Sequence, residues 1–146
     1  ATGGSMTWSC TIPGEPVAMG RPRFSGGKFP RAYLPKKTRD WVRGATIILR
    51  SQWGAAPLEG AVAVELVFVH SRPKRLCRKK DAHGRLWRDR RPDIDNLCKS
   101  ALDAIQAAGI VADDGQVAVL EGRDMYGAKG ESGKVEISVW RLGEMG

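Results

Sequence analysis

The chain has 146 residues, of which 42% are hydrophobic, and its formal net charge is +8. This length corresponds to one domain and allows a hydrophobic core that needs neither disulfides nor a structural metal. The apolar runs are too short for a transmembrane helix, so we expect no membrane span and no signal peptide. We interpret residues 1–5 as an expression remnant ahead of Met6, and residues 6–146 as a single domain.

The cysteines and histidines do not indicate a metal or disulfide scaffold. Cys10, Cys77 and Cys98 are odd in number and widely spaced, which matches neither a zinc-binding nor a disulfide pattern. His70 and His83 are too few for a histidine-based metal site. A cytoplasmic location is expected, because thiols stay reduced there.

The N-terminal half is predicted to contain two strands, a loop and a helix. Residues 7–12 favour a short strand, and the Gly- and Pro-rich residues 13–27 a loop. A helix is predicted over residues 38–53, with Thr38 as its N-cap and apolar side chains at helical spacing. Residues 61–69 are Val-rich and nearly all apolar, which indicates a strand buried on both faces near the centre of a sheet.

The C-terminal half adds a helix and two strands. Residues 96–108 show one apolar helical face, and Gly109 is well placed to end this helix. Residues 113–115 indicate a turn, and residues 116–121 and 134–140 indicate strands. The order of elements predicts an α+β domain in which a mixed β-sheet packs against two main helices.

The excess positive charge lies in one segment, residues 72–91, which contains ten Lys/Arg against Asp81 and Asp89. The remaining 14 Lys/Arg are balanced by 14 Asp/Glu. A basic patch on a neutral body is typical of a protein that binds a polyanion, although a solvated surface loop is about equally frequent for such a run. The segment has no apolar periodicity, so we predict a mobile loop that contacts the DNA backbone. The predicted DNA-binding residues are Arg72, Lys74, Arg75, Arg78, Lys79, Lys80, Arg85, Arg88, Arg90 and Arg91.

Two smaller features accompany this segment. Trp87 lies inside it, and we interpret its ring either as a surface that stacks on a splayed base or as a buried anchor for the loop. Arg21 and Arg23 form a second small basic group in the N-terminal loop.

Asp93 and Asp95 directly follow the basic segment. In an extended segment, side chains at i and i+2 point to the same side, whereas on a helix they diverge. The two carboxylates can therefore converge only if residues 93–95 are extended, which the flanking residues permit, since Pro92 disfavours a helix just before it. In the alternative, Asp95 is the N-cap of the helix and Asp93 is a solvated loop acid. For an isolated Asp-x-Asp this alternative is the commoner by roughly ten to one.

Lys99 lies one helical turn after Asp95, and Asp113 and Asp114 precede the next strand. A surface charge ladder and a plain turn would explain them separately. Two carboxylates about 4 Å apart repel by ~4 kcal/mol at an effective dielectric of 20, so a cluster is tolerable if a divalent cation neutralises it. Mg²⁺ prefers oxygen ligands and can activate a water beside a phosphodiester, while Lys99 stabilises a developing oxyanion. Together with the basic segment, this predicts metal-assisted chemistry on nucleic acid.

Residues 93–117 resemble the RusA family of Holliday junction resolvases, which occurs in bacteria, prophages and phages. They contain Asp-x-Asp-Asn-Leu, a lysine four residues past the second Asp, Asp-Ala one turn later, and Asp-Asp-x-Gln-Val after a glycine, all at the family's spacing. Residues 12–23 and 33–38 resemble the beginning of many phage-type members more weakly. The long basic segment is a departure, since shorter relatives carry only a brief basic run there.

The resemblance implies a RusA-like fold and a small homodimeric endonuclease of the bacterial cytoplasm, encoded by host or phage. Such an enzyme cuts four-way DNA junctions symmetrically with Mg²⁺, for which Mn²⁺ can substitute. Carried over by position, Asp93, Asp95 and Asp114 are the essential carboxylates and metal ligands. Lys99 is the essential lysine, and Asp113 takes an accessory metal position.

Two other classes of function remain open. One is a non-catalytic basic nucleic-acid-binding protein whose acids are only caps and turns, and the other is a nuclease that acts on flaps or replication forks. The nuclease signature Pro-Asp…(Asp/Glu)-x-Lys is set aside, because no Asp/Glu-x-Lys follows Asp93 at a suitable distance. Two matched cuts in one junction favour a homodimer. Leu102, Ile105 and residues 117–120 are candidates for its apolar contact, unless they belong to the core.

Overall fold

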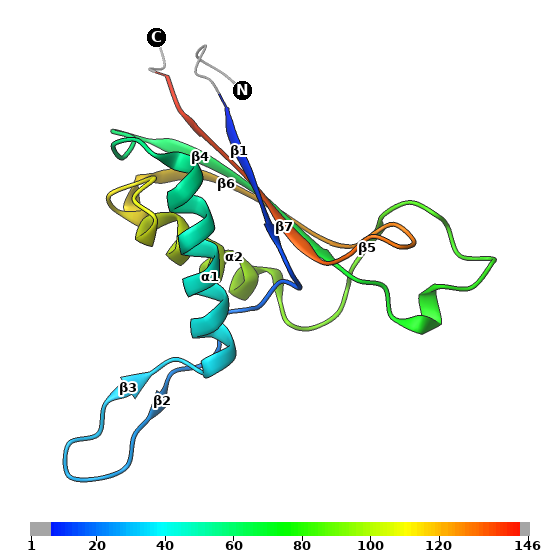
Figure 1. Ribbon diagram of the computed structural model, residues 1–146, viewed down its shortest axis with the longest axis horizontal. Coiled ribbons are helices and arrows are strands. Elements are labelled where there is room, and N and C mark those ends of the chain that lie inside the picture. The colour runs from blue at the N-terminus through cyan, green and yellow to red at the C-terminus, as the bar shows by residue number, and fades with distance from the viewer. Residues whose placement is uncertain (1–6, 144–146) are drawn as a thin grey trace.

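The computed structural model describes residues 7–143, which form a sheet with two helices on one face (Figure 1). This arrangement confirms the predicted α+β class with a mixed sheet and two main helices. The proposed expression remnant, residues 1–5, lies outside the described residues. Over the described range, no helix combines the length and the apolar character that crossing a membrane requires.

The strands lie in the order β1 (Trp8–Pro13), β7 (Lys134–Arg141), β4 (Val62–His70), β6 (Val117–Tyr126) and β5 (Leu86–Trp87). β4 and β6 run parallel, and the other neighbouring pairs are antiparallel. The Val-rich β4 lies at the centre and is mostly buried, which confirms its predicted place. β5 pairs only with Met125 and Tyr126, the last two residues of β6. Among residues 7–143, the rest of this edge of β6 therefore has no strand partner.

The helices α1 (Lys36–Trp53) and α2 (Ile94–Ala107) pack against each other and cover the sheet. Their facing side chains form the core, in which Leu97 and Ile105 have no exposed surface. Full burial places Ile105 in the core and excludes it from a dimer contact. Gly109 follows α2 with φ of 81°, a left-handed conformation that suits glycine at the end of a helix.

The predicted N-cap role of Thr38 is wrong. α1 begins two residues earlier, and Pro35 occupies the N-cap position. Thr38 is 2% exposed, and its hydroxyl accepts a hydrogen bond from the Gly20 N–H at 3.1 Å and donates one to the Ala18 carbonyl at 3.1 Å. The hydroxyl therefore holds the preceding chain against α1 and is not used to close the helix.

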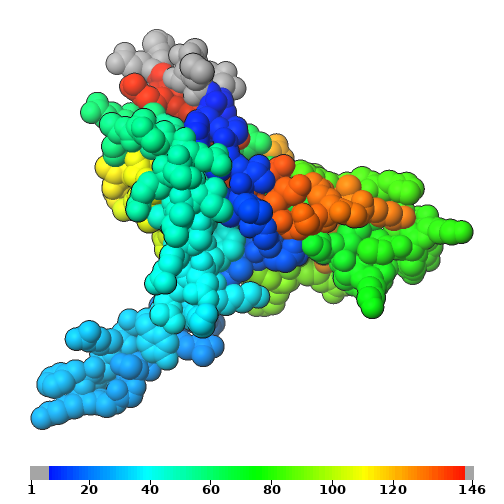
Figure 2. Space-filling model, viewed as in Figure 1, coloured from blue at the N-terminus to red at the C-terminus, as the bar shows by residue number. Residues whose placement is uncertain are grey.

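Four short elements connect the main ones. β2 (Arg23–Phe24) and β3 (Ala32–Tyr33) form a separate two-stranded hairpin, which projects from the body in Figure 2. The loop predicted over residues 13–27 therefore contains the first strand of this hairpin. Two 3-10 turns, η1 (Lys74–Leu76) and η2 (Asp114–Gln116), lie in the basic segment and before β6.

Candidate active site

The beginning of α2 presents the carboxylates of Asp93 and Asp95 to solvent. Asp93 occupies the N-cap position in an extended conformation, with φ of −72° and ψ of 150°, and its carboxylate makes no capping hydrogen bond. Its carbonyl already accepts the main-chain N–H groups three and four residues ahead, each at 3.2 Å, so Ile94 is helical. The condition for convergence, an extended segment over residues 93–95, is therefore not met, and the alternative that Asp95 is the N-cap is wrong.

Two neighbouring hollows receive these side chains. Asp95 and Lys99 line a hollow of ≈ 410 Å³, and Asp93 lines one of ≈ 610 Å³. Ile94 and Gly122 belong to both and form the wall between them. Lys99 thus lines the same hollow as Asp95, and Asp93 lines the adjacent hollow.

Asp113 and Asp114 lie at the opposite end of α2, in the turn before β6. Gln116 holds this turn: its Oε1 accepts the Asp113 N–H at 3.1 Å, and its amide donates to the carbonyls of Leu58 at 2.8 Å and Gly60 at 2.9 Å. Sequence reasoning assigned Gln116 no role beyond its place in the resembling motif. The structure makes it the residue that positions the turn carrying Asp114.

Asp114 lies close to Asp103 and distant from Asp95. Burial raises the pKa of Asp103, and the negative charge of Asp114 raises it further. Asp103 follows Asp95 by eight residues, which is about 12 Å along a helix. Within residues 7–143, no three His, Cys, Asp or Glu side chains lie close enough to hold one metal ion. A single chain therefore brings Asp95 and Lys99 together and leaves Asp114 at a separate place.

A buried polar network borders the hollow beside Asp93. Asp124 binds His70 Nε2 through Oδ1 and Arg88 Nη1 through Oδ2, both at 2.8 Å. Arg88 also donates to the main-chain carbonyls of the two residues that precede Asp93, so the network fixes the chain that leads into the site. Its members lie 54 and 36 residues apart in the sequence, and no local pattern indicated it.

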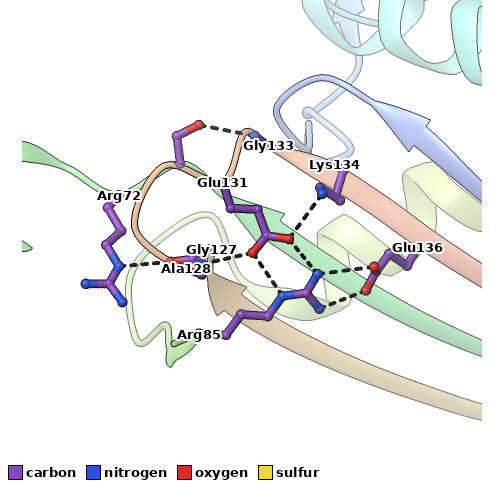
Figure 3. A network of polar contacts seen from close by, with 9 residues as sticks. Arg72, Arg85, Gly127, Ala128, Glu131, Gly133, Lys134 and Glu136 are labelled. Atoms are coloured by element: carbon purple, nitrogen blue, oxygen red, sulfur yellow. Dashed lines mark hydrogen bonds and ion pairs between the residues drawn. The ribbon is translucent and has the colours of Figure 1, made fainter. Parts of the chain in front are cut away.

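Figure 3 shows how the basic segment is tied to the connection between β6 and β7. Arg85 pairs with Glu131 at 2.8 Å and with Glu136 at 2.9 Å, and Arg72 donates to the Gly127 carbonyl at 2.8 Å. The hydrogen bonds from Arg85 lower the pKa of Glu131 to about 2. Acceptors distant in sequence therefore attach parts of the segment to the sheet, and the predicted mobility of the loop stays a prediction.

The ten cations predicted to bind DNA differ in what they contact. Three use their guanidinium groups to contact two or more different residues of the chain, and one of these, Arg88, has only 7% of its side chain exposed. These three are Arg72, Arg85 and Arg88. Others have no ion pair and no side-chain hydrogen bond with any residue that the structure describes, which leaves their charge available to a partner. This second group is Lys74, Lys79, Lys80 and Arg91.

The remaining three cations make longer contacts at the surface, namely Arg75 with the Tyr126 hydroxyl, Arg78 with Asp81, and Arg90 with Asp89. Trp87 borders the larger hollow and is 70% exposed. The interpretation of Trp87 as a buried anchor is therefore wrong. Stacking of its ring on a base stays a prediction.

Comparison with known proteins agrees with the motif around these residues. The family model described as Endodeoxyribonuclease RusA matches residues 13–139. The chain is also 29% identical over 136 residues to "Uncharacterized protein YqaN" of Bacillus subtilis (strain 168), which corresponds to 88% of this chain and 92% of that protein. The family match spans both ends of α2, and so it includes Asp93, Asp95, Lys99 and Asp114.

Proposed function

Because this chain belongs to the RusA endodeoxyribonuclease family, a family of Holliday junction resolving hydrolases, we propose that it resolves four-way DNA junctions by a pair of symmetric, metal-dependent cuts. The observation that carries the proposal is the hollow at the beginning of α2. There Asp95 and Lys99 lie together with Asp93 beside them, and none of the three has an ion pair with any residue in the described range. Two carboxylates and a lysine beside one another, with none of their charge used in an internal ion pair, offer ligands for a divalent metal and a cation for a phosphate.

The donor chemistry of these residues fits a divalent metal. Asp93, Asp95 and Asp114 offer exposed carboxylate oxygens, which are the ligands that Mg²⁺ prefers, and Asp113 is an accessory donor. We assign Mg²⁺ to these carboxylates, with Mn²⁺ as a substitute. When bound, the metal would activate a water and neutralise charge on the scissile phosphate. Lys99 would hold the phosphate and stabilise the negative charge that develops during hydrolysis.

A homodimer follows from the substrate, because two matched cuts call for a two-fold pair of sites. The open edge of β6 supports this proposal: Val119 is 39% exposed and Leu120 is 44% exposed, beside the partly buried Leu102 of α2. Antiparallel pairing of two β6 edges would run the beginning of one strand along the end of the other. It would thereby bring Asp114 of the partner subunit toward the end of α2 that carries Asp93 and Asp95.

Mixed dimers test this arrangement of the site. Asp95→Asn and Asp114→Asn chains are each expected to be inactive, and co-refolding the two should restore one intact site per mixed dimer. The expected product is a junction nicked in a single strand. If the two mutations act within the same chain, both sites of the mixed dimer are damaged and no nicking returns. Sedimentation equilibrium that shows only monomer together with full junction resolution would contradict the dimer itself.

A substrate panel tests the reaction. Labelled four-way junctions, flaps, forks and linear duplexes are incubated with the protein in Mg²⁺, in Mn²⁺, and in EDTA. We expect paired symmetric cuts in the junction with either metal and none in EDTA, and Asp40→Asn on the exposed surface of α1 serves as the matched control for loss of a carboxylate. Preferred cutting of flaps or forks would redirect the substrate assignment. DNA binding without metal-dependent cutting of any substrate would favour the non-catalytic alternative.

A further inference from the structure

The β2–β3 hairpin and its flanks form an arm, residues 20–35, that projects away from the core (Figure 2). The arm carries four cations, Arg21, Arg23, Lys28 and Arg31, and no acidic residue. None of the four makes an ion pair or a side-chain hydrogen bond with another residue of the described chain. Its positive charge is therefore not used in folding.

The arm also exposes aromatic rings that no core covers. Phe29 is 81% exposed, Phe24 is 72% exposed and Tyr33 is 44% exposed. Lys28 Nζ lies 6.0 Å from the centre of the Phe29 ring, so cation and ring share the tip of the hairpin. Grouped exposed apolar side chains mark contact surfaces, because leaving them in water gives folding no benefit.

The base of the arm is anchored beside the active site. The Met19 N–H donates to the Asn96 carbonyl at 2.9 Å, in the first turn of α2. The Gly20 N–H donates to the Thr38 hydroxyl at 3.1 Å, and a Cβ on Gly20 would lie 2.7 Å from Pro35 Cγ. These contacts hold the arm between the beginnings of α1 and α2. The beginning of α2 carries Asp93 and Asp95.

We propose that the arm is a second DNA contact that takes unpaired nucleotides next to the cleaved strand, a role that rests on the proposed junction substrate. Cations would hold successive phosphates while Phe24 and Phe29 stack on bases, which is how positively charged grooves with aromatic platforms bind single strands. Charge complementarity selects this partner. A nucleic-acid strand offers one negative charge per nucleotide, and the arm holds four cations and no acidic residue.

Removal of the rings tests the stacking. Binding of Phe24→Ala/Phe29→Ala is measured in EDTA, where no strand is cut, to a single-stranded oligonucleotide, a four-way junction and a linear duplex. Each ring that no longer stacks on a base lowers affinity about tenfold, so single-strand binding should fall about 100-fold while duplex binding changes by less than about threefold. Ile47→Ala removes an apolar side chain that is 61% exposed on α1, and it is expected to change neither.

A base analogue whose fluorescence depends on stacking, 2-aminopurine, reports the interaction directly when it replaces an adenine at the branch. Wild type is expected to change its emission, and the double variant is expected to leave it as in free DNA. Equal single-strand affinity and equal emission for the two proteins would overturn the proposal. So would a shift of the variant from dimer to monomer at unchanged DNA affinity, because the arm would then pack on a second copy.

The cleavage assay separates this inference from the proposed function. Suppose that wild type cuts no junction, but that removing the two rings abolishes single-strand binding. The junction assignment then fails, and the arm still binds unpaired DNA. If wild type resolves junctions and the double variant binds and cuts as wild type does, the inference about the arm fails alone.

Discussion

The basic segment, residues 72–91, and the arm, residues 20–35, are both rich in Lys and Arg, yet the fold treats their charges differently. In the basic segment Arg85 meets Glu131 and Glu136, and Arg88 meets the buried Asp124. The arm has no acceptor within reach of its cations in the described chain. Positive charge in a sequence therefore predicts a polyanion contact only where the fold leaves that charge without an internal partner.

The largest expected effect separates chemistry from binding. Asp95→Asn and Asp114→Asn should each lower junction cleavage in Mg²⁺ by about 10³-fold or more, because each removes a proposed metal ligand worth several kcal/mol to the transition state. Junction affinity should hold, since both cationic regions are intact. Single-turnover cleavage and binding in Ca²⁺ measure the two effects.

Thermal unfolding is the control for these two variants. Asp95 is not the N-cap of α2, so Asp95→Asn should leave the melting temperature nearly unchanged. If either variant cuts junctions as fast as wild type does, the residue that it replaces is not part of the catalytic site.

The next effect shows what an internally paired cation does. Arg88→Ala leaves Asp124 buried and without its cation, which costs about 3–5 kcal/mol in the free energy of unfolding. Cleavage should fall as well, because the carbonyls before Asp93 lose their donor. Arg90→Ala is the matched control, since its side chain is 62% exposed and only 4.0 Å from Asp89 at its nearest approach. Urea unfolding of the two variants with equal midpoints would contradict the distinction between paired and available cations.

The parts of this fold that depend on local pattern were predictable. The buried strand β4, the core face of α2 and the end of α2 at Gly109 followed from apolar spacing and from a single glycine. β6 continues past the predicted end at residue 121 through Gly122, Arg123 and the buried Asp124, and a glycine followed by two charged residues gives no strand pattern that can be read from the sequence alone. A lone capping residue is equally ambiguous, which explains the error at Thr38: whether its hydroxyl closes a helix or holds another segment depends on chain 18 to 20 residues away.

The candidate site was predictable in its residue types and not in its geometry. The motif singled out Asp93, Asp95, Lys99 and Asp114, but their distances depend on where α2 begins and on how the chain returns to β6. The length of α2 separates Asp95 from Asp114, so within one chain, over its described residues, the four side chains do not form a cluster. Long-range pairs such as His70 with Asp124 have no local signal, because their chemistry appears only when the sheet assembles.

A smaller effect sharpens the comparison within the basic segment itself. Lys79→Ala/Lys80→Ala should make the dependence of log affinity on log salt less steep by about 0.9 for each phosphate that the variant no longer neutralises, at unchanged stability. Arg85→Ala should leave this slope unchanged and lower the stability, because the charge of Arg85 is used by Glu131 and Glu136. Salt titrations of junction binding, paired with unfolding curves, test both. Equal slopes for the lysine variant and wild type would mean that these two lysines do not touch DNA.

The smallest effect comes from pH and reports the internal pairing alone. Arg85 holds the pKa of Glu131 at about 2 in the folded chain, below the ordinary 4.5 that applies when it is unfolded. Because the folded pKa is depressed, the stabilisation is complete above about pH 4.5 and is lost as the pH falls toward 2. Wild type should therefore lose stability relative to Glu131→Gln between pH 5 and about 2, as measured by urea unfolding at a series of pH values. Acid in this range should therefore weaken the attachment of the basic segment, because Glu131 loses its charge. The charge of the arm stays constant, because the arm holds no acidic residue. A stability difference that does not depend on pH would mean that Arg85 gains little from the charge of Glu131, and that Glu136 holds the segment in place.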